Sequence, residues 1–149
     1  MLSLYELDNY LKENNCDFAI IEHKSPIIQT LDAAKYFDIK KSAPTFILQT
    51  ERGLIALIAS FQQERLDFKS IKQKSGFKKI EMADKAEVLK AIGYHVGAIP
   101  LIGHNLPCIF DNRLLVHDYV YGGSGDEYHT LKIAPTDIIR LNNIVAFID

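Results

Sequence analysis

The stretch that most constrains the fold is Gly97-Ala98-Ile99-Pro100-Leu101-Ile102-Gly103-His104-Asn105-Leu106-Pro107, with two glycines and two prolines in eleven residues. Glycine permits positive φ and close backbone approach, while proline fixes φ and lacks an N–H donor, so neither a helix nor a central strand continues through it. The intervening residues are mostly apolar, unlike a solvated linker. The stretch therefore predicts a tight loop whose backbone forms one wall of a substrate pocket. A plain connection between a helix and a strand is the alternative.

Length and composition predict a single globular domain. The chain has 149 residues, of which 48% are hydrophobic and 24% charged, so it can bury a core and is not typical of a disordered protein. No repeat or linker divides it, and we expect residues 1–149 to form one compact domain. The net charge of −2 provides no overall field that attracts a polyanion, so contact with nucleic acid needs a local patch, and no binding to DNA is expected.

The cysteines and the N-terminus favour a cytoplasmic protein. Cys16 and Cys108 are isolated, which argues against a disulfide framework and suits a reducing compartment. The first residues carry acids where a signal peptide would carry bases. No apolar run approaches the roughly 18 residues of a membrane span, so no membrane contact is expected.

Hydrophobic periodicity and capping residues predict the order of the elements. Helices are expected at 4–14, 30–37, 66–72, 84–92 and 135–141, and strands at 18–23, 45–48, 54–59, 79–83, 108–111, 114–117, 119–121, 129–134 and 144–148. The apolar runs 45–48 and 54–59 flank Gly53 and predict a hairpin in the middle of a sheet, covered on both faces. This mixture of helices and hairpins indicates an α+β fold around a mixed sheet.

Two further stretches carry polar chemistry. Gly122-Gly123-Ser124-Gly125 precedes Asp126 and His129, so its backbone can approach a ligand that His129 orients or protonates, although a polar hairpin turn is the alternative. A basic segment contains one acid, Asp67, and can contact phosphates, although the solvated face of an amphipathic helix is the alternative. Its basic residues are Arg65, Lys69, Lys72, Lys74, Lys78 and Lys79.

Other catalytic and metal-binding signatures are missing from the sequence. The five histidines have neither H-E-x-x-H nor H-x-H spacing, so we expect no metal site. The G-x-S-x-G pattern and the P-loop pattern are also absent, so neither a serine-hydrolase elbow nor a Walker nucleotide site is indicated. We expect no cofactor.

Four features follow one another along the chain: His23 with Thr30-Leu31-Asp32-Ala33-Ala34 after it, Ala43-Pro44-Thr45-Phe46-Ile47-Leu48, Gly97-Ala98-Ile99-Pro100-Leu101-Ile102-Gly103, and Asp111-Asn112-Arg113-Leu114-Leu115 with the stretch 122–129. In this order they resemble the YbaK/ProX superfamily of aminoacyl-tRNA deacylases, which is related to the editing insertion domain of bacterial prolyl-tRNA synthetases. The resemblance spans nearly the whole chain. It implies a single α+β domain with a mixed, mostly antiparallel, barrel-like sheet packed with helices.

The resemblance implies that the chain hydrolyses the ester between a mischarged amino acid and the 3′-terminal adenosine of tRNA, without a metal. Such editing is needed because a pocket discriminates one methylene by only about 1–3 kcal/mol. Gly97 and His129 would be catalytic, the loop placing its amides and a water at the ester carbonyl. The partner would be the tRNA 3′ end, and an aminoacyl-tRNA synthetase is a second candidate partner. The substrate would contact Ala98, Ile99, Pro100, Gly103, Ser124 and Lys41, and the tRNA phosphates would contact Lys69, Lys72 and Lys74.

Three positions differ from the superfamily pattern. Its deacylases carry a substrate-contacting lysine one residue before a threonine and an apolar run, where this chain has Pro44, which offers neither charge nor donor. Leu101-Ile102 stands where many relatives have Pro-Phe. Two hypotheses follow: a freestanding editing deacylase that acts in trans, and a non-catalytic member that binds an aminoacyl-adenosine or an amino-acid-like ligand. An interaction protein with a vestigial pocket is a third and weaker alternative.

Overall fold

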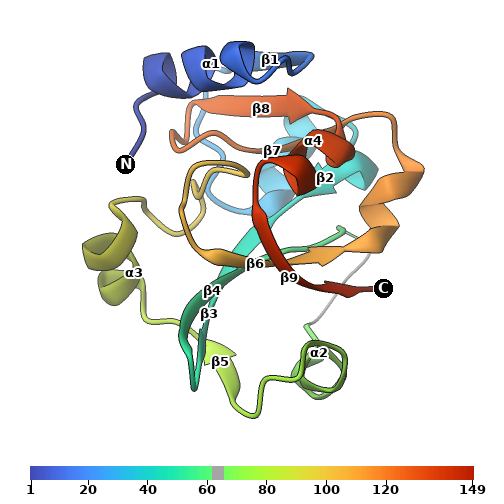
Figure 1. Ribbon diagram of the computed structural model, residues 1–149. Helices are drawn as coiled ribbons and strands as arrows, with labels where there is room; N and C mark the ends of the chain where they lie inside the picture. Colours follow the sequence, from blue (N-terminus) through green and yellow to red (C-terminus); the bar gives the residue numbers. More distant parts are fainter. Residues whose placement is uncertain (62–65) are drawn as a thin grey trace.

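The computed structural model describes residues 1–61 and 66–149, which form an α+β fold (Figure 1). The α-helices are α1 (Leu4–Glu13), α2 (Phe68–Ser75), α3 (Lys85–Ile92) and α4 (Pro135–Arg140), and the 3-10 helices are η1 (Thr30–Lys35), η2 (Ile39–Lys41) and η3 (Asn112–Val116). The strands are β1 (Phe18–Glu22), β2 (Ser42–Ala43), β3 (Thr45–Thr50), β4 (Gly53–Ile58), β5 (Ile80–Met82), β6 (Pro107–Asp111), β7 (Val120–Gly123), β8 (His129–Ile133) and β9 (Asn143–Ile148).

The described strands pair into two mixed sheets. The four-stranded sheet has the order β1-β8-β7-β2, and the five-stranded sheet has the order β5-β3-β4-β6-β9. The pairs β2–β7, β4–β6 and β6–β9 are parallel, and the remaining pairs are antiparallel. The predicted α+β fold and mixed sheet are therefore confirmed, with the strands divided between two sheets that do not close into a barrel within the described residues.

Local capping signals mark where α1 begins, where α2 ends, and where α3 begins and ends. Ser3 and Glu6 form a reciprocal capping box at the start of α1, and the Asp84 side chain accepts a hydrogen bond from the Glu87 amide at the start of α3. Gly76 and Gly93 end α2 and α3 in the left-handed conformation, each with φ of 80°.

The predicted hairpin β3–β4 lies inside the five-stranded sheet and is covered on both faces. Ile47 and Ala56 belong to the larger core cluster, which also includes residues of α1, α3 and the 97–103 loop. Leu48 and Ile55 point to a second cluster, which includes Ile71 of α2. Side chains alternate between the two faces of a strand, and here each face packs against a hydrophobic cluster. Nearly every residue of this hairpin is therefore apolar.

One predicted strand is wrong. Residues 114–117, expected as a strand, lie mostly in the 3-10 helix η3. The reason is local: the Asp111 carboxylate accepts hydrogen bonds from the backbone amide and the guanidinium of Arg113, which tightens the chain into a turn. No helix among the described residues is long and apolar enough to cross a membrane.

Candidate functional site

A cavity of about 320 Å³ lies where the two sheets, the segment before η1 and the glycine-proline loop meet. Its lining comes from segments far apart in the sequence, and most of it is apolar. The lining residues are 27–30, 33, 42–46, 96–99, 121–123, 126, 129 and 130. Of the glycine-proline loop expected to form a pocket wall, residues 97–99 line this cavity, next to Val96.

Backbone contacts that only glycine permits hold the loop in place. Gly97 has φ of 99°, and a Cβ built there would stand 2.5 Å from the carbonyl oxygen of Ile28. A Cβ on Gly123 would stand 1.9 Å from the carbonyl oxygen of Ile99. The amide of Leu101 donates to the carbonyl of Gly123 at 3.0 Å. The two glycine-rich stretches of the sequence therefore pack directly on each other, β7 against the loop.

Two backbone amides of the loop have no hydrogen-bond partner in the described part of the chain. The amide of Ala98 donates to the carbonyl of His95, and that of Leu101 is engaged by Gly123. Within residues 1–61 and 66–149, the amides of Gly97 and Ile99 donate no hydrogen bond, and both residues line the cavity. Unpaired N–H groups beside a cavity can accommodate a carbonyl oxygen or an oxyanion.

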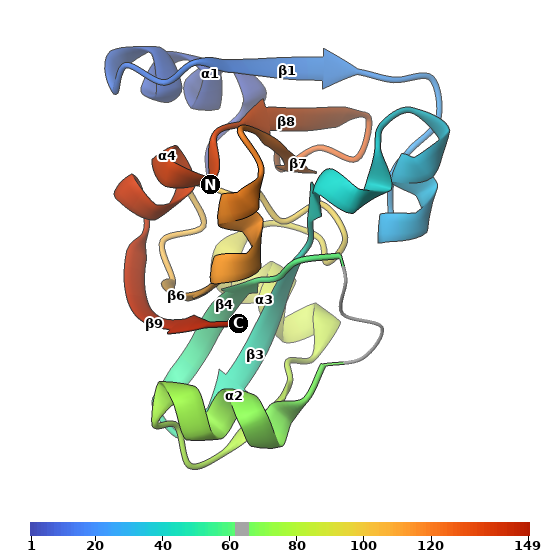
Figure 2. The same ribbon diagram turned by 90° about the vertical axis from the view of Figure 1, so that its right-hand side faces the viewer.

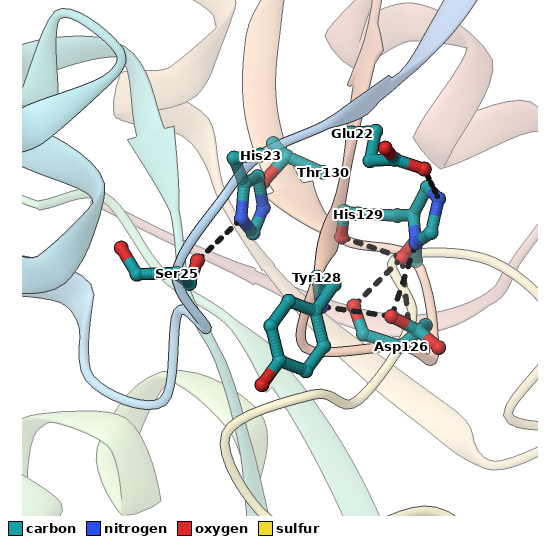
Figure 3. Close-up of polar contacts among 8 residues, drawn as sticks. Glu22, His23, Ser25, Asp126, Tyr128, His129 and Thr130 are labelled. Atoms are coloured by element: carbon teal, nitrogen blue, oxygen red, sulfur yellow. Dashed lines mark hydrogen bonds and ion pairs between the residues drawn. The ribbon is translucent and has the colours of Figure 1, made fainter.

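His129 lies in the cavity wall between two carboxylates (Figure 3). Its Nδ1 is 3.1 Å from Oδ1 of Asp126, and its Nε2 is 3.4 Å from Oε2 of Glu22, the residue opposite it in the β1–β8 pairing. The hydrogen bond from His129 holds the pKa of Asp126 below its ordinary value. The hydroxyl of Ser124 donates to the His129 carbonyl at 2.6 Å. The ring is thus oriented from both sides and can act in proton transfer.

His23 contacts a residue of the same wall but does not itself line the cavity. Its Nδ1 lies 2.7 Å from the carbonyl oxygen of Ser25 and its Nε2 lies 3.1 Å from the hydroxyl of Thr130, a residue of the cavity lining (Figure 3). Because a carbonyl only accepts, Nδ1 carries a proton. The His23 side chain is buried and stacks on Tyr36, with ring centroids 5.1 Å apart. His23 therefore positions Thr130 without itself lining the cavity.

Pro44 is part of the lining, between two polar neighbours that sequence reasoning missed. The side-chain oxygens of Ser42 and Thr45 are buried and have no hydrogen-bond partner in the described part of the chain, and both residues line the cavity. Lys41, the nearby candidate for substrate binding, is not among the lining residues. Its Nζ instead lies 3.6 Å from Oδ1 of Asp118.

The structure brings only some of the predicted site residues together. Gly97, Ala98, Ile99 and His129 line the cavity, whereas Pro100 and Ser124 are buried and are not among its lining residues. Gly103 borders a separate hollow with Leu2 and Leu106. Sequence reasoning missed Asp126 and Thr130 as lining residues, although both are near His129 in the chain.

The predicted phosphate-binding lysines lie far from the cavity. Lys69, Lys72 and Lys74 are on α2, which packs against β9 and β5. Figures 1 and 2 both show α2 at the opposite end of the molecule from β7 and β8. Lys74 donates to Asp149 at 2.7 Å, and Arg65 lies outside the described residues. Among the described residues, no three potential ligands from histidine, cysteine, aspartate and glutamate gather as a metal site would require.

Comparison with known proteins identifies a matching sequence family and several similar structures. The sequence model of the aminoacyl-tRNA editing domain family matches residues 24–141. The crystal structure of the hypothetical protein APE2540 is similar, with a TM-score of 0.83 and 23% identity over 96% of this chain and 97% of that chain. The crystal structure of a proposed trans-editing enzyme for prolyl tRNA synthetase also has a TM-score of 0.83, with 20% identity over 100% of this chain and 98% of that chain. At these identities the structural likeness shows the fold.

Proposed function

Because this chain belongs to the aminoacyl-tRNA editing domain family, we propose that it is a freestanding deacylase that hydrolyses mischarged aminoacyl-tRNA in trans. The observation that carries the proposal is the cavity wall, where the unpaired amides of Gly97 and Ile99 and the ring of His129 border one small space. A site with hydrogen-bond donors for an oxyanion and a group for proton transfer suits the hydrolysis of an ester.

The proposed reaction uses water as the nucleophile. The ester carbonyl oxygen accepts hydrogen bonds from the loop amides, which stabilise the negative charge that develops when water attacks the carbonyl carbon. His129 takes a proton from the water and returns it to the ribose oxygen as the ester bond breaks. The products are the free amino acid and tRNA with its terminal hydroxyl restored. Asp126 and Glu22, on either side of the ring, stabilise the protonated imidazole.

The size of the cavity supports a small aminoacyl group as the substrate. Its volume of about 320 Å³ is at the lower end of the range for ligand pockets. Apolar side chains such as Ile27, Ala33 and Phe46 contribute to the lining, so the pocket suits a small side chain and excludes a large one. The fold shared with a proposed trans-editing enzyme for prolyl tRNA synthetase supports a proline tRNA that carries the wrong amino acid as the first substrate to test.

The proposal also covers the extent of the editing domain and its partners. We propose that residues 1–149 act as one editing domain in the cytoplasm, with the tRNA 3′ end as partner and an aminoacyl-tRNA synthetase as a further candidate. Lys69, Lys72 and Lys74 remain candidates for phosphate contact only with a part of tRNA distant from the aminoacyl group.

A panel of mischarged tRNAs tests the activity. Wild-type protein is expected to deacylate at least one of them, and His129→Ala is expected to lower the rate by roughly 100-fold or more. His117→Ala is the matched control, because His117 lies outside the cavity lining. If every tRNA in the panel decays at the uncatalysed rate, the deacylase proposal is wrong.

Pro44 supports a second candidate function, a non-catalytic module that binds an aminoacyl-adenosine or an amino-acid-like ligand. Pro44 borders the cavity without a charge or an N–H donor. This function predicts that a non-hydrolysable aminoacyl-adenosine raises the melting temperature while no mischarged tRNA is hydrolysed. If no such analogue changes the melting temperature, the binding function is excluded as well.

A further inference from the structure

A row of aromatic rings leads from the cavity to the surface beside it. Tyr121 lines the cavity, and the Phe37 ring stacks on it with centroids 4.4 Å apart. The Tyr119 ring meets Tyr121 edge-on, with centroids 5.5 Å apart and planes at 81°. Both tyrosines are half-buried, so part of each side chain remains accessible. Aromatic side chains on strand β7 and just before it thus continue the cavity wall outward.

Two lysines gather at the outer ring of this row. The ammonium groups of Lys41 and Lys132 each lie 4.0 Å from the centroid of the Tyr119 ring. Lys132 is opposite Tyr121 in the β7–β8 pairing, which fixes it next to the row. Lys41 contacts the largely exposed Asp118, and Lys132 forms no ion pair within residues 1–61 and 66–149. The cluster therefore carries a net positive charge in a chain whose net charge is −2.

We propose that Lys41, Tyr119 and Lys132 bind the single-stranded nucleotides that precede the terminal adenosine of tRNA, an inference that rests on the proposed function. Proteins that bind single strands combine aromatic rings, on which bases stack, with positive side chains along the phosphates. This combination adjoins Tyr121 of the cavity wall, so a strand whose last ribose lies at the cavity can reach it. The lysines of α2 lie at the far end of the molecule and cannot meet the same nucleotides (Figure 2).

Binding measurements with two non-hydrolysable ligands test the inference without requiring turnover. The first ligand is an amide-linked aminoacyl-adenosine, and the second carries the same aminoacyl group on a single-stranded ribotetranucleotide ending in CCA. We expect wild type to bind the longer ligand about 10-fold more tightly at low salt, with a gain that decreases as salt rises. Lys132→Gln and Tyr119→Leu should remove most of this gain, whereas Tyr119→Phe, which keeps the ring, should retain it. All three variants should bind the aminoacyl-adenosine like wild type.

The control variants and a third ligand separate the two proposals. Lys69→Gln and Lys72→Gln, on α2, should keep the full gain. If wild type binds both ligands equally, or if Lys132→Gln and Tyr119→Leu keep the gain, the surface proposal is overturned while binding in the cavity stands. The tetranucleotide without an amino acid probes the surface alone. If it binds wild type more tightly than Lys132→Gln while aminoacyl-adenosine does not bind, the surface is supported and the cavity function fails.

Discussion

The α-carbon of Gly97 faces the carbonyl oxygen of Ile28 so closely that a Cβ at position 97 would stand 2.5 Å from that oxygen. Both residues line the cavity, which means that one wall is positioned by backbone packed on backbone. A side chain at position 97 would push the loop away from the segment before η1. The loop amides that we propose to bind the ester carbonyl would then move with it.

Gly97→Ala should therefore lower deacylation sharply, because the loop must shift to relieve the contact with Ile28. Its free energy of unfolding should also fall, by roughly 1–3 kcal/mol. Gly53→Ala is the matched control, since Gly53 has a similar φ of 105° but no atom within 4 Å of the added methyl group. Rates on mischarged tRNA and urea unfolding curves measure the two effects. Equal losses of activity in the two variants would contradict the role of the close contact.

Pro44→Lys should raise the deacylation rate by about 10-fold or more, because it places an ammonium donor in the cavity wall. The substitution leaves the Pro44 carbonyl free to accept its hydrogen bond from the Ala59 amide, at 2.9 Å. Pro44→Met, of similar length and without charge, is the control. A comparable increase with methionine would show that removal of the proline ring, and not the charge, is responsible.

Thr45→Val should leave stability unchanged or raise it by up to ~1 kcal/mol, because it removes a buried hydroxyl that has no partner among the described residues. Thr50→Val gives the contrast: the Thr50 hydroxyl donates to the Gly53 carbonyl at 2.9 Å and accepts from the Arg52 amide at 3.1 Å. That variant should lose about 1–3 kcal/mol. Urea unfolding measures both, and a destabilised Thr45→Val would show that its hydroxyl is paired in solution.

His104 should make the protein less stable as the pH falls from 6.5 toward 4. Its ring is buried, its Nδ1 accepts from the Leu106 amide at 3.0 Å, and burial lowers its pKa from 6.5 to about 4. Between these values the unfolded chain binds the proton and the folded chain does not, so acid favours unfolding. At pH 4.5 the loss is roughly 2–3 kcal/mol relative to neutral pH.

His104→Asn tests this assignment, since its side-chain oxygen can still accept from the Leu106 amide but does not titrate in this range. Urea unfolding at pH 7.5 and pH 4.5 should show a smaller loss for the variant than for wild type. The same loss in both proteins would mean that other groups cause the pH dependence.

The sequence was sufficient wherever the structural cause lies within a few residues. Ser3, Asp84, Gly76 and Gly93 mark helix ends through contacts with their own neighbours, and the hairpin follows from two apolar runs around Gly53. The strand predicted at 114–117 was wrong because the side chain of Asp111 bonds to Arg113 and favours a turn. The apolar pattern of these residues carries no sign of that contact.

The site depends on contacts between distant segments, and only the tertiary structure decided them. The β1–β8 register places Glu22 beside His129, and the packing of β7 against the loop puts Gly123 under Ile99. Composition did not predict that Lys41 would lie beside Tyr119. It also did not predict that the lysines of α2 would lie at the end of the molecule away from β7 and β8 (Figure 1). Backbone preferences are local, so the sequence by itself determined the glycine-proline loop and the fold class. Side-chain partners follow from strand register and packing, so the structure alone decided what the loop faces.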